Sequence, residues 1–154
     1  MPQVRSAGIL LWRRRGPDLE VFIAHMGGPF WAKKDAAAWS IPKGEYLDDE
    51  DDLVAAKREF LEEIGVAAPA LDYVRLGEFR QSSGKIVVAF AAESDFEVET
   101  LTSNTFTLEW PPRSGRQQEF PEIDEARWLG LEDARTRLVK GQVPVLDALV
   151  ALLA

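Results

Sequence analysis

Short apolar runs separated by turn residues recur along the chain and predict a series of β-strands. The first two runs, residues 6–12 and 19–26, flank the turn-like segment RRRGPD and predict a hairpin. Three further strands are predicted at residues 71–81, 85–94 and 125–130. Residues 27–51 are predicted to be mostly loop. Within the polar and aromatic stretch 95–125, residues 109–122 hold too many prolines for regular structure.

The pattern changes to a helical period over residues 51–64. Apolar residues spaced by three or four predict a buried stripe along this helix, formed by Leu53, Ala56, Phe60 and Ile64. Asp48 and Asp49 lie where an N-cap is expected, and Gly65 follows as the C-terminal stop. Two more helices are predicted, at residues 131–141 and 143–154. This order of strands and helices predicts an α/β sandwich, a mixed sheet flanked by helices.

Composition narrows the class of protein. A length of 154 residues fits a single domain over residues 1–154 with one sizeable core. The net charge of −8 argues against binding to nucleic acid or to an anionic membrane, and the absence of cysteine excludes disulfides and thiol nucleophiles. No stretch approaches the roughly 20 apolar residues of a membrane span, and the N-terminus lacks a signal-peptide pattern. We therefore expect a cytoplasmic protein, and its oligomeric state stays open.

Three glutamates, Glu59, Glu62 and Glu63, are separated by three positions and then one, so they fall on one side of the helix predicted at residues 51–64. Like charges this close repel one another, and no lysine or arginine follows at residues 62–67 to relieve the repulsion. The simpler interpretation is an acidic face exposed to solvent. The alternative is a site for Mg²⁺ or Mn²⁺, because such hard cations prefer carboxylate oxygens. The cluster alone leaves both open.

The residues around the cluster favour the metal site. From Gly44 the chain reads glycine, five residues, Glu50, seven residues, and then REFLEEIGV at residues 58–66. This spacing resembles the Nudix box and fills each of its fixed positions, with Phe60 a slightly unusual choice at one apolar position. The resemblance implies membership of the Nudix hydrolase family, an α/β/α sandwich with a mixed sheet, and hydrolysis of a nucleoside diphosphate linked to another moiety.

The same resemblance implies a role for individual residues. The metal-binding groups it implies are the backbone carbonyl near Gly44 and the carboxylates of Glu59, Glu62 and Glu63. Glu50 and Arg58 resemble the pair that braces the loop against the helix, and direct contact with phosphate is the alternative for Arg58. Mg²⁺ or Mn²⁺ would neutralise the diphosphate and lower the pKa of a bound water. The proton of that water would pass to Glu63 or to a glutamate from a distant loop.

Two segments outside or at the edge of the box resemble animal-type diadenosine tetraphosphate hydrolases. Residues 38–45, AWSIPKGE, correspond to a Pro-Pro-Lys-Gly turn in that group, with Ile41 in place of the first proline. That group also carries a glutamate six residues before a tryptophan, a place that Glu122 holds before Trp128. Glu122 is therefore predicted to be a further metal ligand or the general base. Glu119 competes with it, because the alignment through this loop is loose.

Substrate contacts are predicted for three residues. Lys43 stands directly before the box glycine and is a candidate for binding phosphate, and Lys85 opens a strand expected to run near the site. Trp110 lies in segment 101–121, which is longer than the corresponding loop of the diadenosine tetraphosphate hydrolases. Its ring is a candidate for stacking on a nucleobase, and the alternative is that it pins the loop to the core.

The sequence thus predicts divalent-metal-dependent hydrolysis of a diphosphate linkage in a nucleotide derivative. Dinucleoside polyphosphates such as diadenosine tetraphosphate are the favoured small-molecule substrates, and no nucleic acid or membrane partner is expected. A nucleoside triphosphate pyrophosphatase that removes damaged nucleotides is the first alternative. The second is a non-catalytic Nudix module that binds a nucleotide, which the intact box disfavours.

Overall fold

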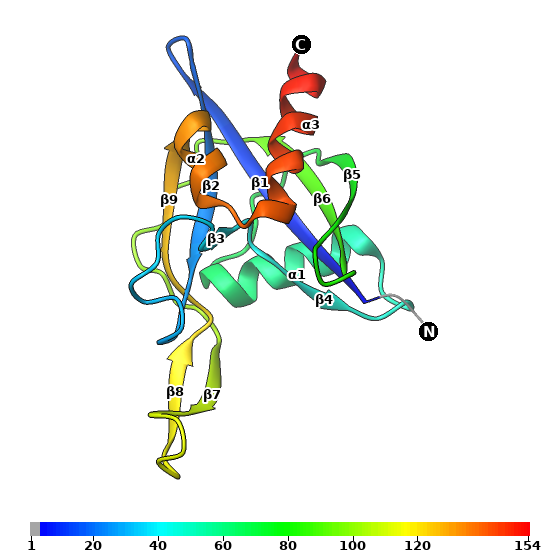
Figure 1. The fold of residues 1–154 in the computed structure, drawn as a ribbon. Coiled ribbons are helices and arrows are strands. Elements are labelled where there is room, and N and C mark those ends of the chain that lie inside the picture. The colour runs from blue at the N-terminus through cyan, green and yellow to red at the C-terminus, as the bar shows by residue number, and fades with distance from the viewer. Residues whose placement is uncertain (1–3) are drawn as a thin grey trace.

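A computed structural model describes residues 4–154. The strands are β1 Arg5–Arg15, β2 Asp18–Met26, β3 Trp39–Ser40, β4 Lys43–Tyr46, β5 Val74–Arg80, β6 Ile86–Glu93, β7 Thr105–Glu109, β8 Gln117–Pro121 and β9 Ile123–Gly130. The helices are α1 Asp52–Ile64, α2 Leu131–Arg137 and α3 Val143–Leu153, with a 3-10 turn at Lys140–Gln142. Figure 1 shows how these elements are arranged.

The main sheet is mixed, as the sequence predicts. Its strands follow the order β3-β2-β1-β6-β5, with β4 also paired to β1 and β9 also paired to β2. The long strand β1 runs parallel to β6 and antiparallel to its other partners. Residues 5–8 of β1 pair with β4, and residues 12–15 pair with β2 in the predicted hairpin. One strand therefore carries both the hairpin and the short strand that leads into the Nudix box.

Helices cover both faces of this sheet. Alternate residues of β1 point to opposite faces, since the side chains of a strand alternate. Ala7, Ile9 and Leu11 pack in the cluster that contains Phe60 of α1, whereas Leu10 packs in the cluster that contains residues of α2 and α3. In Figure 1, α1 accordingly lies across the sheet from α2 and α3. The predicted α/β/α sandwich is confirmed.

Helix α1 follows its predicted stripe closely. Ala56, Phe60 and Ile64 are fully buried, and Leu53 is partly buried at the edge of the cluster. Gly65 ends the helix as predicted, with a left-handed φ of 92°.

The predicted N-cap of α1, at Asp48 and Asp49, is wrong. Asp51 caps the helix, and its carboxylate accepts hydrogen bonds from the backbone N–H groups of Leu53 and Val54 at 3.1 Å. Asp48 and Asp49 instead lie in a turn closed by a hydrogen bond of 3.0 Å from the Glu50 N–H to the Leu47 carbonyl. This turn precedes the helix, so its acids are too early in the chain to cap it.

The prediction that residues 109–122 lack regular structure is also wrong. Strands β7 and β8 form a separate two-stranded hairpin, in which Phe106 is paired with Phe120 and Leu108 with Gln118. The prolines do not interrupt this pairing because Pro111 and Pro112 lie in the turn and Pro121 ends β8. We call residues 105–121 the arm, because in Figure 1 they project from the body of the molecule.

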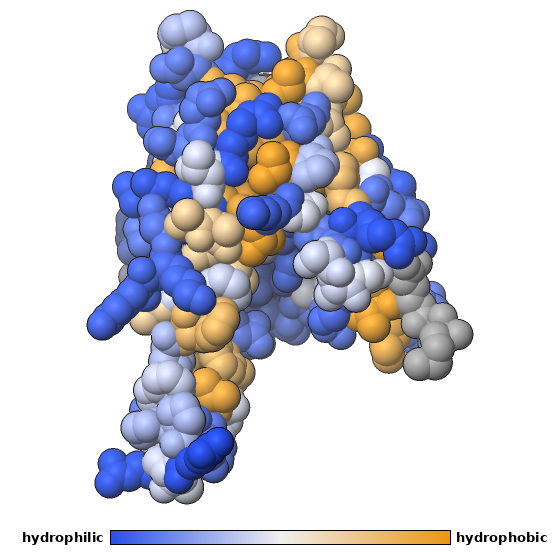
Figure 2. Space-filling model, viewed as in Figure 1, coloured by the Kyte–Doolittle hydropathy of each residue, from blue (hydrophilic) through white to orange (hydrophobic). Residues whose placement is uncertain are grey.

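Some large apolar side chains remain exposed. On the face shown in Figure 2, orange atoms lie along α3 and where the arm joins the body. On α3, Val150 is 39% and Leu152 is 45% exposed. Within residues 4–154, no helix is both long and apolar enough to cross a membrane.

The cap of α1 gives a direct test of the corrected helix start. Asp51→Ala should lower the free energy of unfolding by about 1 kcal/mol, because two N–H groups of the first turn lose their acceptor. Asp49→Ala is the matched control, with an expected change within about 0.5 kcal/mol. Urea denaturation of both variants measures the difference, and equal losses would place the cap elsewhere.

Candidate active site

The first residues of the site come from β4 and α1, which pack closely against each other. A Cβ atom at Gly44 would overlap the carboxylate of Glu59. Glycine is therefore needed here so that the helix can bring an acid against the strand. Hydrogen bonds to β1 hold β4 in place, with Gly44 opposite Ala7 and Lys43 opposite Gly8.

Arg58 braces the loop before α1 against the helix. Its Nε and Nη2 atoms both donate to the Glu50 carboxylate at 2.9 Å, and its Nη1 atom donates to Glu59 at 2.8 Å. Longer contacts of 3.4 Å reach both carboxylate oxygens of Glu62. The hydrogen bonds from Arg58 lower the pKa of Glu50. The guanidinium is thus engaged by protein groups, an arrangement suited to positioning Glu59.

Glu63 is the most buried acid of the site. Only 8% of the residue is exposed, and its Oε1 atom accepts a hydrogen bond of 2.7 Å from the Lys43 backbone N–H. Burial raises the pKa of Glu63 to about 8, and the negative charges of Glu122 and Glu59 add to this rise. Burial also raises the pKa of Glu59, with a further contribution from Glu62. These carboxylates therefore sit where negative charge is poorly solvated.

Glu122 reaches the same site through a chain of backbone hydrogen bonds. The Asn104 N–H donates to the Glu62 carbonyl, the Glu122 N–H donates to the Asn104 carbonyl, and the Gly27 N–H donates to the Glu122 carbonyl, each at 2.8 Å. Burial and the charge of Glu62 raise the pKa of Glu122. Its carboxylate has no hydrogen-bond donor within residues 4–154.

These groups line one pocket of about 400 Å³. Its walls are Ser6, Lys43, Gly44, Glu45, Glu59, Glu62, Glu63, Gln81, Lys85, Val87 and Glu122. Seven residues that the sequence singles out are thus brought together: Lys43, Gly44, Glu59, Glu62, Glu63, Lys85 and Glu122. Lys85 lies at the rim, with its ammonium 3.1 Å from the Glu45 carboxylate.

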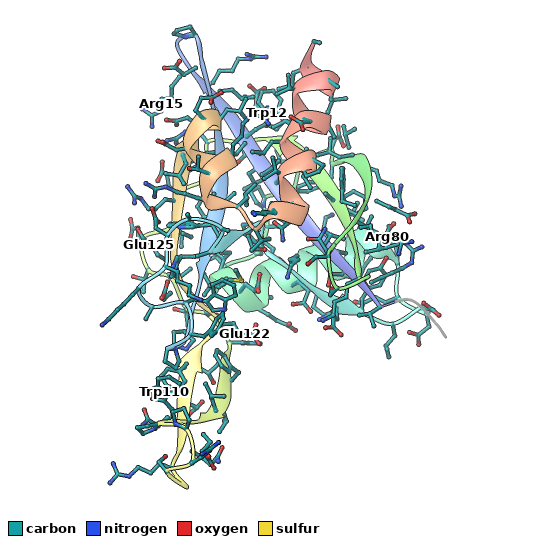
Figure 3. All side chains as sticks on the ribbon, viewed as in Figure 1. Trp12, Arg15, Arg80, Trp110, Glu122 and Glu125 are labelled. Carbon is teal, nitrogen blue, oxygen red and sulfur yellow. The ribbon has the colours of Figure 1, made fainter. Side chains whose placement is uncertain are left out.

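Three other candidates lie outside the walls of this pocket. Arg58 stands behind the acids it contacts. Glu119 is exposed on β8 and accepts a hydrogen bond from the hydroxyl of Thr105. Trp110 lies towards the end of the arm, well apart from Glu122 at its root, as Figure 3 shows.

Ser6 and Gln81 also line the pocket, although no sequence pattern marks either residue. Gln81 is oriented by hydrogen bonds from its Nε2 atom to the carbonyls of Phe79, at 3.0 Å, and Gly141, at 3.1 Å. Ser6 belongs to β1, where it pairs with Glu45 of β4. Neither residue belongs to a motif, so only the folded sheet reveals that they face the site.

The donor groups of the pocket fit a hard divalent cation. Five carboxylates line it, and two of them, Glu59 and Glu63, are buried. Burial raises the pKa of both, and the negative charge of Glu59 adds to the rise at Glu63. Within residues 4–154, no three acidic or histidine side chains are already gathered into a closed ligand set. Glu59 accepts a hydrogen bond from Arg58, and Glu63 accepts one from the Lys43 backbone N–H. Each bond engages one carboxylate oxygen, so the second oxygen of each acid is left for a cation. A divalent ion would relieve the repulsion among these acids.

Comparison with known proteins identifies the family. The family model of the NUDIX domain matches residues 2–149, so this chain belongs to the Nudix hydrolases, which are pyrophosphohydrolases and need a divalent metal ion.

Solved structures share the fold. A Caenorhabditis elegans Ap4A hydrolase in a binary complex has a TM-score of 0.65 and 21% identity, over 97% of each chain. The NUDIX domain of Shewanella oneidensis NrtR complexed with ADP ribose has a TM-score of 0.65 and 15% identity, over 100% of this chain and 90% of that one. A MutT protein from Methanosarcina mazei has a TM-score of 0.60 and 18% identity, over 99% of this chain and 96% of that one. At these identities the likeness establishes the fold and not the substrate.

The buried position of Glu63 predicts a pH dependence of stability in the metal-free protein. Its folded-state pKa of about 8 lies above the ordinary 4.5, so the folded protein retains a proton that the unfolded chain releases. The free energy of unfolding should therefore fall as pH rises from about 4.5 to about 8. Glu63→Gln should reduce this fall.

Urea denaturation in the presence of a chelator, at steps between pH 4.5 and 8.5, measures this effect. Glu99→Gln, in an exposed loop, controls for the loss of one negative charge. Parallel pH profiles for the wild type and Glu63→Gln would contradict the assignment.

Proposed function

We propose that this protein is a Mg²⁺- or Mn²⁺-dependent Nudix pyrophosphohydrolase that cleaves a diphosphate linkage in a nucleotide derivative, with dinucleoside polyphosphates as its preferred class of substrate. The observation that carries this proposal is the convergence of Glu59, Glu62 and Glu63 with Glu122, an acid from a distant part of the chain, on one pocket. The resemblance of residues 38–45, and of Glu122 six residues before Trp128, to diadenosine tetraphosphate hydrolases favours this class of substrate. A Caenorhabditis elegans Ap4A hydrolase shares the fold.

The acids of the box and the backbone carbonyl of Gly44 would hold the divalent ions. Such ions neutralise the charge of the diphosphate and lower the pKa of a bound water. Arg58 keeps Glu59 in place through its hydrogen bond of 2.8 Å, while Glu50 holds the other side of the guanidinium. We assign Arg58 to positioning rather than to phosphate binding because its donors are already engaged by carboxylates.

Lys43 and Lys85 would bind the phosphate chain. Both residues line the pocket, where they supply local positive charge in a protein of net charge −8. The ammonium of Lys85 contacts Glu45 at the exposed rim, an ion pair of the kind that contributes little and exchanges readily for a phosphate. Polyanion binding would thus depend on these two lysines together with the cations.

Glu122 is our candidate for the general base. The carboxylates of the other acids of the pocket accept hydrogen bonds from Arg58, from the Lys43 backbone N–H or from Lys85, whereas the Glu122 carboxylate has no donor within the described residues. Its oxygens are therefore available to accept the proton of the attacking water. The chain of hydrogen bonds through Asn104 fixes its backbone beside Glu62, so the distant acid is held at the site.

A nucleoside triphosphate pyrophosphatase is the alternative activity, and a MutT protein from Methanosarcina mazei shares the fold. The fold is also shared with the ADP-ribose complex of the NrtR NUDIX domain. The same pocket would bind each of these diphosphates, because its acids, through bound cations, and its lysines would contact the phosphate chain and not the groups beyond it.

A substrate screen tests the reaction and its metal requirement. We expect hydrolysis of diadenosine tetraphosphate with Mg²⁺ or Mn²⁺, at a kcat/KM above those for nucleoside triphosphates and ADP-ribose, and no turnover after chelation. Chromatography of the products measures each rate. Absence of hydrolysis for all of these nucleotides with either metal would refute the proposed enzyme.

The two candidate bases outside the box can be separated by matched substitutions. Glu122→Gln should lower kcat by about 10²- to 10⁴-fold, because the water loses its proton acceptor. Glu119→Gln, three residues away, should keep kcat within about twofold of the wild type, since exposed substitutions away from a site change little. Steady-state kinetics with the substrate found in the screen measures both, and the reverse order would assign the role to Glu119.

A further inference from the structure

A second cavity, of about 230 Å³, adjoins the acidic pocket and shares Lys43, Glu63 and Glu122 with it. Its other principal walls are apolar side chains from outside the Nudix box: Met26, Trp31 and Phe106. The cavity thus combines the groups that we assign to the diphosphate with aromatic surface. In Figure 2, apolar surface lies at the corresponding place, where the arm joins the body.

We propose that Trp31 and Phe106 form a slot for the planar base of the nucleotide substrate. This inference rests on the proposed function, because it takes the diphosphate to lie on the acids of the adjoining pocket. Aromatic side chains stack favourably on any nucleobase, and ring faces attract one another in offset or edge-to-face arrangements. The slot would supply affinity that does not depend on charge, which suits a protein of net charge −8 that binds a polyanion.

Trp31 is held in place by its own loop. The backbone N–H of Trp31 donates to the Gly28 carbonyl at 3.2 Å, and the Trp31 carbonyl accepts from the Lys34 backbone N–H at 2.9 Å. The Trp31 and Phe30 rings also meet edge to face, with ring centroids 4.9 Å apart, and Trp31 packs against the buried cluster beneath α2 and α3. These contacts exist without a ligand, so this wall of the slot is preformed.

Phe106 is held at the root of the arm. A Cβ atom at Gly28 would lie 2.7 Å from the tip of its ring, so the ring rests directly on the backbone of the loop that carries Trp31. Gly28 also has a φ of 94°, a conformation that favours glycine. On the arm itself, Phe106 faces Phe120 with ring centroids 6.0 Å apart. The second wall is therefore also fixed by the fold.

The root of the arm, rather than its end, then meets the substrate. The backbone of Trp110, the predicted stacking residue, is paired within the arm: its backbone N–H donates to the Arg116 carbonyl at 2.9 Å, and its carbonyl accepts from the Gln118 side chain at 2.8 Å. It lines neither cavity, and Figure 3 shows it displaced from Glu122 along the arm. Segment 101–121 would thus contribute Phe106 to the base, and its root also holds Asn104 beside Glu122.

A pair of inert ligands tests the slot separately from hydrolysis. The ligands are α,β-methylene-ADP and methylenediphosphonate, which share a non-hydrolysable diphosphate and differ by the nucleoside. Calorimetry with Mg²⁺ should show that Trp31→Leu and Phe106→Leu each weaken binding of α,β-methylene-ADP by roughly 10- to 100-fold. Both variants should bind methylenediphosphonate within about twofold of the wild type. Trp31→Phe, which keeps an aromatic face, should restore most of the nucleotide affinity.

Leu108→Ala is the matched control, because Leu108 lies on the arm two residue pairs beyond Phe106 and lines neither cavity. Unchanged binding of α,β-methylene-ADP by both leucine variants would overturn the slot, as would an equal loss of both ligands or no binding by the wild type. Thermal melting confirms that each variant is folded, and Trp31→Leu alone carries the test if Phe106→Leu does not fold. If the wild type hydrolyses nucleotides but both leucine variants bind α,β-methylene-ADP as tightly as the wild type, only the slot is overturned. If the leucine variants lose affinity for α,β-methylene-ADP alone but the wild type hydrolyses no nucleotide, only the proposed function is overturned.

Discussion

The packing of acidic side chains of α1 against β4 is the constraint on which the rest of the site depends. Glu59 and Glu63 are each only 8% exposed, although a buried carboxylate is costly unless it is paired or bound to a cation. Gly44 makes this packing possible because any larger residue would overlap Glu59. The fold therefore holds negative charge in a place where it is stable only with protons or with a cation, which is the property that a metal-dependent hydrolase requires.

The surrounding elements serve this arrangement in different ways. The long strand β1 anchors β4 on one side of the site, and Arg58 joins the preceding loop to the acids of the helix. Glu122 comes from a distant part of the chain and is joined to Glu62 by backbone hydrogen bonds through Asn104. A segment outside the box therefore completes the pocket. The Trp31 and Phe106 rings adjoin that pocket, which gives the reaction centre and the proposed base slot a common boundary at Glu63 and Glu122.

Much of the fold and of the acidic pocket is predictable from local sequence patterns. The period of Ala56, Phe60 and Ile64 locates α1, and the spacing from Gly44 to Gly65 brings three acids to one place because a helix and a short strand are rigid units. The arm is not predictable in this way, since its prolines suggest irregular structure although they lie in its turn and at its end. Trp31 and Phe106 share no motif and lie far apart in sequence, so their common cavity depends on long-range packing. The Gly27–Gly28 pair is the one local sign that another part of the chain comes close to this loop.

The central claim is that the acids of α1 bind divalent cations for catalysis. Its most direct test is a crystal structure with Mn²⁺, in which anomalous scattering locates each ion. We expect at least one Mn²⁺ bound by the carboxylates of Glu59, Glu62 or Glu63 and by the carbonyl of Gly44, within the pocket that Glu122 completes. A fully loaded crystal with its Mn²⁺ ions only outside this pocket would contradict this metal site.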